Sequence, residues 1–448
     1  MADEDITPVD APRLSPDQET ALGYLTNTGD NVFLTGKAGA GKSHVLRRAV
    51  ELLQKRYGMA GVIITASTGV AAANVGGITL HSFASVGLDD KIKARMAVDK
   101  MGHRAKIGWK KTLVLVIDEI SMVHGRFLTL LEEVGRLVRD EPDLPMGGIR
   151  VIMVGDFLQL PPVKNKEEDV QFAFESEGWR RLAPRCVLLT NDHRQSDGDF
   201  INVLGEARLG VLSERAIQFL RERVIDTPEH KERWLDGKPP PCYLFPHNAD
   251  VDTHNERELV KLPGPTACFR ARDDIYMGPP DALKHIQAPA ELKLRVGAEV
   301  MYLVNTNVHG GWFNGARGVI TELNEKKHHI RMRLHQTGRA TNLDQAKWEI
   351  KRGEVVLARR QQYPIRLAWA TTMHKSQGQT ITGPVIFPLD TSVFEYAQAY
   401  VALSRVRTAD QLGLQKLRPQ CVRAHPKALA FEAQLRTAQK CGADDTTT

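Results

Sequence analysis

An α/β fold built on parallel sheets is predicted by the alternation of short β-branched runs with helical stretches along the chain. The runs are "NVFLTG", "GVIITAS", "LVLVIDE", "RVIMVGD" and "CVLLT". A different pattern fills 292–360, where short strands are separated by Gly and Asn turns, and it predicts a small antiparallel β-module inserted in a larger domain. The length of 448 residues suits two or three domains.

Composition and charge limit the class of protein. With 42% hydrophobic and 25% charged residues the chain has a globular profile. The 60 Lys and Arg residues against 54 Asp and Glu give a net charge of +6, which permits a polyanionic partner without requiring one. The five cysteines form no CxxC pair, so neither a disulfide framework nor a zinc site is indicated, and a reducing compartment fits best.

Membrane and targeting segments are not indicated by the sequence. No apolar run approaches the roughly 18 residues of a membrane span. The acidic start "MADEDITPVDAPRLSPDQE" lacks the basic and apolar pattern of a targeting peptide. We therefore expect an intracellular protein without a membrane partner, in the cytoplasm of a bacterium or virus-infected cell or in a eukaryotic nucleus.

The strongest chemical signal is "GKAGAGKS", from Gly36 to Ser43, between the strand "NVFLT" and a helix. Glycines allow backbone N–H groups to close around phosphates at a helix N-terminus, Lys42 adds a positive charge, and the Ser43 hydroxyl can hold Mg²⁺. A Gly-rich turn can match by accident, but the strand before it and the helix after it favour a nucleotide site. The expected contacts are Gly36, Ala38, Gly39, Ala40, Gly41, Lys42, Ser43 and His44.

An acidic pair ends the apolar run "LVLVIDE". Such pairs are common at strand ends, but beside a phosphate-binding loop Asp118 is expected to hold Mg²⁺ together with Ser43, and Glu119 to polarise a water molecule that attacks ATP. Phosphoryl transfer also needs cations on the developing charge, and Arg194 and Arg405 are the candidates. Taken singly, each arginine is more often a solvated surface residue.

A series of sequence blocks occurs in order from about Leu14 to about Leu417. They are "LSPDQ", "GKAGAGKS", "ITASTGVAAANVGGITLHSF", "VIDEISM", "GDFLQLPPV", "HRQ", "LRVGAEVMYLVN", "NGARGVI", "AWATTMHKSQGQTI" and "YVALSRVRT". With these blocks the chain resembles the Pif-type DNA helicases of superfamily 1, in the branch that also contains RecD and that translocates 5′ to 3′. The resemblance implies two RecA-like P-loop domains with ATP in the cleft between them, single-stranded DNA across their top, and an SH3-like β-module inserted in the second domain.

The resemblance and the strand pattern together set the expected domain limits. They are an N-terminal extension at 1–13, a first RecA-like domain at 14–181 with a small wedge segment at about 76–110, a second RecA-like domain at 182–291 and 361–435, the SH3-like insert at 292–360, and a disordered tail at 436–448.

Further nucleotide contacts follow from the resemblance alone. Gln18 would read the adenine edge, and Gln377 and Gly378 would face the nucleotide. Gln159, in "VGDFLQLPPV", resembles the helicase γ-phosphate sensor, and Pro161-Pro162 would stiffen the chain that leads from it toward the DNA. The alternative is that Gln159 only caps a turn.

Two stretches offer contacts for single-stranded DNA, because small donors suit phosphate oxygens and an aromatic ring can stack on a base. The candidates are Thr65, Ser67, Thr68, Thr79 and His81, with Phe83 for stacking, and from the second domain Thr372, His374 and Lys375. Phe83 can instead be a core residue, and His374 a helix cap. The expected partners are single-stranded DNA and duplex junctions, bound by a monomer.

The expected function is that of an ATP- and Mg²⁺-dependent DNA helicase that moves 5′ to 3′ in replication, repair, recombination or telomere maintenance. Two alternatives stay open: a RecD-like or viral translocase that acts in a complex or on RNA, and a protein that uses ATP only to switch its grip on single strands. The set of Lys42, Glu119, Arg194 and Arg405 argues against the last alternative, because a pure switch does not need every group for hydrolysis.

Overall fold

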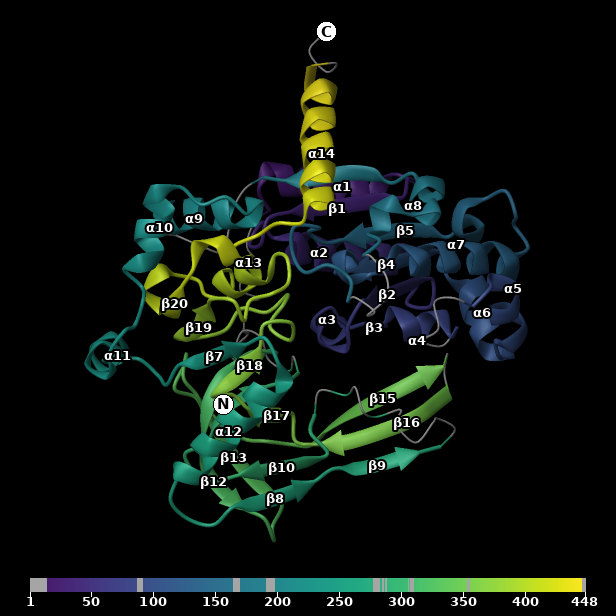
Figure 1. The fold of residues 1–448 in the computed structure, drawn as a ribbon. Coiled ribbons are helices and arrows are strands. Elements are labelled where there is room, and N and C mark those ends of the chain that lie inside the picture. The colour runs from purple at the N-terminus through teal and green to yellow at the C-terminus, as the bar shows by residue number, and fades with distance from the viewer. Residues whose placement is uncertain are drawn as a thin grey trace, which may run out of the picture.

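The structure is a computed structural model that describes residues 14–86, 92–163, 170–190, 198–276, 283, 286, 288–304, 306, 310–352 and 355–444. Two parallel sheets with their helices form the upper part of the molecule in Figure 1, and an antiparallel part lies below them. Within these ranges, no helix combines the length and the apolar character that crossing a membrane requires.

The first domain is built on a six-stranded parallel sheet with the order β3-β2-β4-β5-β1-β6. Its strands are β1 (Val32–Gly36), β2 (Val62–Ala66), β3 (Ile78–Thr79), β4 (Val114–Asp118), β5 (Arg150–Val154) and β6 (Arg185–Leu189). Its helices are α1 (Pro16–Asn27), α2 (Lys42–Tyr57), α3 (Gly69–Asn74), α4 (Leu80–Ala84), α5 (Ala94–Lys100), α6 (His103–Lys111), α7 (Gly125–Arg139) and α8 (Glu177–Leu182).

Helices cover both faces of this sheet, as the near-continuous apolar strands predict. Along β1, Val32 and Leu34 pack toward α1 and α2, whereas Phe33 packs toward α7 and α8. The strand β6 pairs with β1 from Val32↔Arg185 to Gly36↔Leu189. The expected boundary at 181/182 is therefore wrong, because the first sheet continues to Leu189.

The second domain contains a four-stranded parallel sheet with the order β18-β7-β19-β20. The strands are β7 (Cys242–Phe245), β18 (Ala370–Thr372), β19 (Val385–Leu389) and β20 (Leu412–Leu417). Its helices are α9 (Gly198–Leu209), α10 (Glu214–Arg221), α11 (Pro228–Leu235), α12 (Asn248–Lys261) and α13 (Gln398–Leu403). Short 3-10 helices in the chain are η1 (Ile120–Met122), η2 (Pro145–Gly148), η3 (Ala173–Glu175), η5 (Ala409–Gln411) and η6 (Pro419–Cys421).

The antiparallel module is larger than the sequence pattern indicates. Its strands are β8 (Ala267–Arg270), β9 (Arg272–Ile275), β10 (Glu291–Leu294), β11 (Glu299–Tyr302), β12 (Arg317–Asn324), β13 (His329–Leu334), β14 (Ala340–Asn342), β15 (Ala346–Arg352), β16 (Val355–Gln362) and β17 (Ile365–Leu367). They form sheets of the orders β14-β13-β12-β11-β17, β15-β16-β9 and β10-β8. The limits 292–360 are thus too narrow, and an SH3-like class for the module stays a prediction.

The last helix, α14 (Pro426–Asp444), returns from the second domain to the first. Figure 1 shows it above α1, β1 and α8. Ala428 is buried in the core of the first domain, and Phe431 and Leu435 pack against that core. Two expectations are therefore wrong: 436–444 continue a helix and are not a disordered tail, and the end of the 361–435 segment packs on the first domain.

Candidate functional site

The phosphate-binding loop lies between β1 and α2, as predicted. Gly36 runs so close to β6 that an added Cβ would lie 2.7 Å from the Leu189 carbonyl oxygen, and Gly41 has a left-handed φ of 85° at the N-cap of α2. Both positions therefore favour glycine. The Lys42 Nζ donates to the carbonyl oxygens of Gly36 (2.7 Å) and Lys37 (3.1 Å), which places the ammonium group across the loop.

A cavity of about 430 Å³ lies where this loop faces the second domain. Its lining comprises Ala38, Gly39, Gly41, Lys42, Ser43, His44, Arg47, Glu119 and Gln159 from the first domain, and Gly378, Thr380, Arg405 and Arg407 from the second. Because the walls belong to two domains, the shape of the cavity depends on the angle between them.

Of the acidic pair at the end of β4, Glu119 lines this cavity and its neighbour Asp118 is buried. The Glu119 N–H donates to the Asp118 Oδ1 (2.9 Å), and the Gln377 Nε2 of the second domain donates to the Glu119 Oε2 (3.1 Å). Burial, together with the neighbouring charge of Glu119, raises the pKa of Asp118 to about 7. The Oε1 of Gln377 is buried without a hydrogen-bond partner among the described residues.

Asp118 and Ser43 fit a Mg²⁺ ion, because a nearby cation would offset the burial and repulsion that act on the Asp118 carboxylate. No group of three or more His, Cys, Asp or Glu side chains that could hold a metal ion occurs in the described part of the chain. An ion at Asp118 would therefore also need phosphate and water oxygens, which are common ligands of Mg²⁺.

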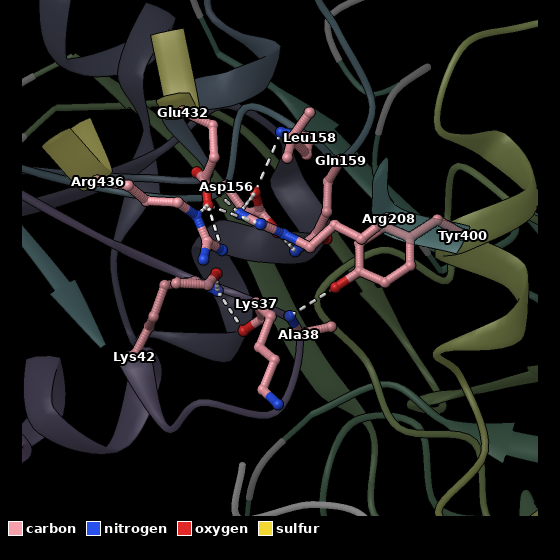
Figure 2. A network of polar contacts seen from close by, with 11 residues as sticks. Lys37, Ala38, Lys42, Asp156, Leu158, Gln159, Arg208, Tyr400, Glu432 and Arg436 are labelled. Atoms are coloured by element: carbon pink, nitrogen blue, oxygen red, sulfur yellow. Dashed lines mark hydrogen bonds and ion pairs between the residues drawn. The ribbon is translucent and has the colours of Figure 1, made fainter. Parts of the chain in front are cut away.

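Gln159 lines the cavity from the turn that follows β5. Its backbone N–H donates to the Asp156 carbonyl oxygen (2.9 Å), so it does close a turn, while its side-chain Nε2 lies 3.5 Å from the Asp156 Oδ2. Figure 2 shows Gln159 beside Asp156 and Arg208, with Tyr400 of α13 nearby. The Tyr400 hydroxyl accepts a hydrogen bond from the Ala38 N–H (2.8 Å), which joins the second domain to the phosphate-binding loop.

Gln18 lies beside the loop, but its Nε2 donates to the Ala40 carbonyl oxygen (3.2 Å) and its Oε1 accepts from the Ser15 N–H (3.1 Å). The amide thus supports the loop, and its contact with adenine stays a prediction. Arg194 lies outside the described residues.

Arg405 lines the cavity, yet its guanidinium is buried and bonded within the second domain. It donates to the carbonyl oxygens of Val401 (2.6 Å), Ser376 (2.8 Å) and Gln379 (2.8 Å) and to the Ser404 Oγ (2.6 Å). Arg405 therefore fixes the wall formed by 376–379, and its role as an arginine finger stays a prediction.

Two of the candidate DNA contacts lie in the core. The buried Thr65 donates its hydroxyl hydrogen to the Val116 carbonyl oxygen (2.6 Å) inside the first sheet. Phe83 is also buried and packs on Trp109, with ring centroids 4.6 Å apart. The prediction that Thr65 and Phe83 contact DNA is wrong, because both side chains are packed in the core and are not accessible to a ligand.

The other DNA candidates of the first domain lie nearer the surface. The Thr68 and Thr79 hydroxyls accept from the Ala71 and Ser82 N–H groups at the starts of α3 and α4. His81 stacks on Phe127, with ring centroids 4.1 Å apart. The Ser67 Oγ is buried without a partner among the described residues.

The second-domain candidates lie at the end of β18, whose last residue is the buried Thr372, and directly after it. The Thr372 Oγ1 accepts from the Lys375 N–H (3.1 Å), and the Lys375 side chain is exposed. Burial lowers the pKa of His374, so its ring is neutral at neutral pH. DNA contacts of these residues stay predictions, as do those of Ser67, Thr68, Thr79 and His81.

Comparison with known proteins agrees with this arrangement. A model of the PIF1-like helicase family matches residues 13–215, and one of the DNA helicase Pif1 2B domain matches 283–323. The ATP-dependent DNA helicase Pif1 of Bdellovibrio bacteriovorus is 35% identical over 438 residues, which cover 96% of this chain and 94% of the relative.

The chain belongs to the PIF1-like helicase family. The ATP-dependent DNA helicase PIF1 of Xenopus laevis is 38% identical over 432 residues, which cover 95% of this chain and 65% of the relative. The chain thus spans about 65% of the length of such vertebrate relatives.

Solved Pif1 structures share the fold. The Pif1 helicase from Candida albicans is 33% identical, with a TM-score of 0.79 over 95% of this chain and 100% of that one. Bacteroides sp Pif1 in complex with ADP-AlF4 is 29% identical, with a TM-score of 0.79 over 96% of this chain and 98% of that one. Bacteroides Pif1 bound to ssDNA has a TM-score of 0.68 at 29% identity, over 96% and 98% of the two chains.

Several residues of this Pif1-family site were not found from the sequence. Arg47 and Arg407 line the cavity. Each had a local signal, since Arg47 lies one helical turn after Ser43 and Arg407 lies two residues after Arg405. Arg208 had none, because its buried partners in Figure 2 are 52 and 224 residues away in the chain.

Proposed function

We propose that this Pif1-family protein hydrolyses ATP in the cavity between its two domains and uses the cycle to move 5′ to 3′ along single-stranded DNA and to separate duplex DNA. The observation that carries the proposal is the shared cavity, in which Lys42 and Glu119 of the first domain face Gly378 of the second. Such an activity suits replication, repair, recombination or telomere maintenance.

The chemistry follows from the residues at the cavity. The loop N–H groups and Lys42 hold the phosphates, and Glu119 accepts a proton from, or orients, the attacking water. Mg²⁺, held by Ser43 and Asp118, would neutralise phosphate charge. Gln159, which lines the cavity, would sense the γ-phosphate, and Arg194 and Arg405 remain the candidate fingers. The bound ADP-AlF4 of the Bacteroides relative supports a nucleotide in this cleft.

Movement follows from the two-domain wall of the cavity. A nucleotide that contacts both walls binds the closed arrangement more tightly, and hydrolysis removes that preference. If each domain holds DNA with a different strength in the two arrangements, repeated closure moves the strand. The single-stranded DNA bound by the Bacteroides relative supports DNA as the track, and the Ser67–His81 and Thr372–Lys375 segments are the proposed contacts.

The test is ATP hydrolysis by the purified chain with Mg²⁺, measured alone, with single-stranded DNA and with RNA of the same sequence. We expect DNA to raise kcat at least about tenfold and Lys42→Ala to abolish turnover. Stimulation by RNA alone would favour a translocase on RNA. DNA binding that responds to ATP without turnover would favour the single-strand switch.

A further inference from the structure

A buried cluster of charges joins three separate parts of the chain, and Figure 2 shows it from close by. Arg208 of α9 donates to both oxygens of Asp156, from Nε to Oδ2 (3.1 Å) and from Nη2 to Oδ1 (2.8 Å). It also donates to both oxygens of Glu432, from Nη1 to Oε1 (2.8 Å) and from Nη2 to Oε2 (3.1 Å). The Arg208, Asp156 and Glu432 side chains are 4%, 0% and 8% exposed.

The three partners come from elements that a change in domain angle would separate. Asp156 follows β5 in the first sheet, and Arg208 lies on α9 of the second domain. Glu432 lies on α14, whose neighbouring residue Phe431 packs on Phe174 with ring centroids 4.2 Å apart. The first domain therefore holds Arg208 from two sides, through Asp156 and through α14.

The charged cluster contacts Gln159, a residue that lines the nucleotide cavity. Asp156 Oδ1 also accepts from the Leu158 N–H (3.1 Å), and Oδ2 lies 3.5 Å from the Gln159 Nε2. Gln159 lines the cavity opposite Gly378. Burial alone would raise the pKa of Asp156, but Arg208, together with Lys42 and the Leu158 N–H, outweighs burial and lowers it, so the carboxylate stays charged.

Stability alone is a weak reason for such a cluster. Buried ion pairs often stabilise a fold no better than apolar residues of the same size, because removing charges from water is costly. A purely structural link between α14 and α9 could use apolar contacts. Two hydrogen bonds from Arg208 instead fix the direction of the Asp156 carboxylate, which lies next to the Gln159 amide, and two more to Glu432 fix the Arg208 guanidinium.

We propose that Arg208 is a positioning residue for ATP hydrolysis, because it orients Asp156 and, through Asp156, the Gln159 amide. Glu432 of α14 holds Arg208 in place, so α14 contributes to the same positioning. We call these three residues the clasp. The inference rests on the proposed function and adds to it a route by which the second domain and α14 act on the γ-phosphate side of the cavity.

The test compares Glu432→Gln and Arg208→Gln with Arg215→Gln. Arg215 is a matched control, since it lies in α10 and pairs with Asp199 at 2.7 Å with side chains that are 82% and 53% exposed. We expect DNA-stimulated kcat to fall about tenfold or more in Arg208→Gln and about threefold or more in Glu432→Gln, with KM for ATP within about twofold. The control should keep both values within about twofold.

A double-mutant cycle with Gln159→Ala separates positioning from packing. If Arg208 acts through Gln159, adding Arg208→Gln to Gln159→Ala lowers kcat by no more than about twofold further. If the clasp only stabilises the fold, the two losses multiply, or both clasp variants keep normal kcat at temperatures below their Tm, and the proposal is overturned.

Two further outcomes need a control: a variant that fails to fold and a wild-type chain that is inactive. Where Arg208→Gln fails to fold, as judged by circular dichroism, the cycle of Glu432→Gln with Gln159→Ala gives the same answer, because Glu432→Gln retains the Arg208–Asp156 pair. A wild-type chain without DNA-stimulated turnover overturns the proposed function and the clasp together. An active wild-type chain with multiplicative losses overturns the clasp alone.

Discussion

Glu119 lines the cavity, and its proposed role is to act on the water that attacks the γ-phosphate. Glu119→Gln keeps the shape of the side chain and an oxygen that can accept the bond from the Gln377 Nε2. We expect ATP to bind within about threefold of its normal affinity while kcat falls about a hundredfold or more, because only the proton acceptor is lost. Equilibrium binding and steady-state turnover measure the two effects, and near-normal turnover would refute the assignment.

Asp118 makes stability depend on pH in an unusual direction. Its pKa is about 7 in the fold, above the 3.8 of an ordinary Asp, so between these values the folded chain holds a proton that the unfolded chain releases. Without Mg²⁺, the free energy of unfolding should therefore fall as pH rises from about 4 to about 7, by at most about 1.4 kcal/mol per pH unit from this group.

Asp118→Asn isolates that contribution, since an amide does not titrate. Denaturant unfolding of the wild-type chain and of Asp118→Asn at pH 5, 6 and 7 should show a stability difference that shifts in favour of the variant as pH rises. A difference that stays constant with pH would show that Asp118 is ionised throughout.

Variants of Arg405 and Arg407 distinguish a residue that supports the cavity wall from one that contacts the ligand. Arg405→Ala removes the bonds to 376–379 and leaves buried carbonyl oxygens unpaired, so we expect a loss of about 3 kcal/mol or more of stability. Arg407 is exposed at the same cavity, so Arg407→Ala should leave Tm unchanged and lower kcat. Thermal melts and turnover of both variants test this, and unchanged turnover in Arg407→Ala would exclude a role for that side chain.

The packing of α4 against α6 determines the environment of Phe83, which lies on α4 and contacts Trp109 on α6. Because Phe83 packs on Trp109 in the core, Phe83→Ala should cost about 3–4 kcal/mol of stability through the cavity it leaves. Affinity for single-stranded DNA, measured where the variant is folded, should change by less than about twofold. A large loss of affinity with unchanged stability would restore the stacking role.

The elements also show what the sequence could predict. The strands that end in the phosphate-binding loop, in Asp118 and before Gln159 were predictable, since buried parallel strands are continuous apolar runs followed by polar residues. The sheet to which β6 belongs could not be predicted, because its pairing with β1 is a long-range contact that leaves no local sequence pattern. The burial of Thr65 and Phe83 was hidden for the same reason, as was the helix over 436–444.

For the whole molecule, the phosphate-binding loop between β1 and α2 was predictable, and its contacts with distant parts of the chain were not. Motif spacing predicts nucleotide contacts for Lys42, Ser43, Asp118 and Glu119, because the loop and the strand end are set by local sequence. The Asp156–Arg208–Glu432 cluster needs the fold, since it depends on α14 crossing back to the first domain. Its partners lie on three elements, and a buried arginine looks like a surface arginine in the sequence.

The proposed movement has a direction, 5′ to 3′, as well as a requirement for ATP. A motor that moves 5′ to 3′ must load on a single strand that lies 5′ of the duplex, and opening one base-pair step costs only about 1.4 kcal/mol on average, which is within the reach of ATP hydrolysis. A blunt duplex offers no such loading site. Lys42→Ala should separate no strands, because phosphate binding and closure are lost together.

Strand separation on tailed duplexes tests whether the protein moves 5′ to 3′. The same duplex is prepared with a 5′ tail, with a 3′ tail and blunt, and product strands are measured with ATP and Mg²⁺. We expect efficient opening of the 5′-tailed duplex and little opening of the other two. Efficient opening from the 3′ tail but not from the 5′ tail would contradict it.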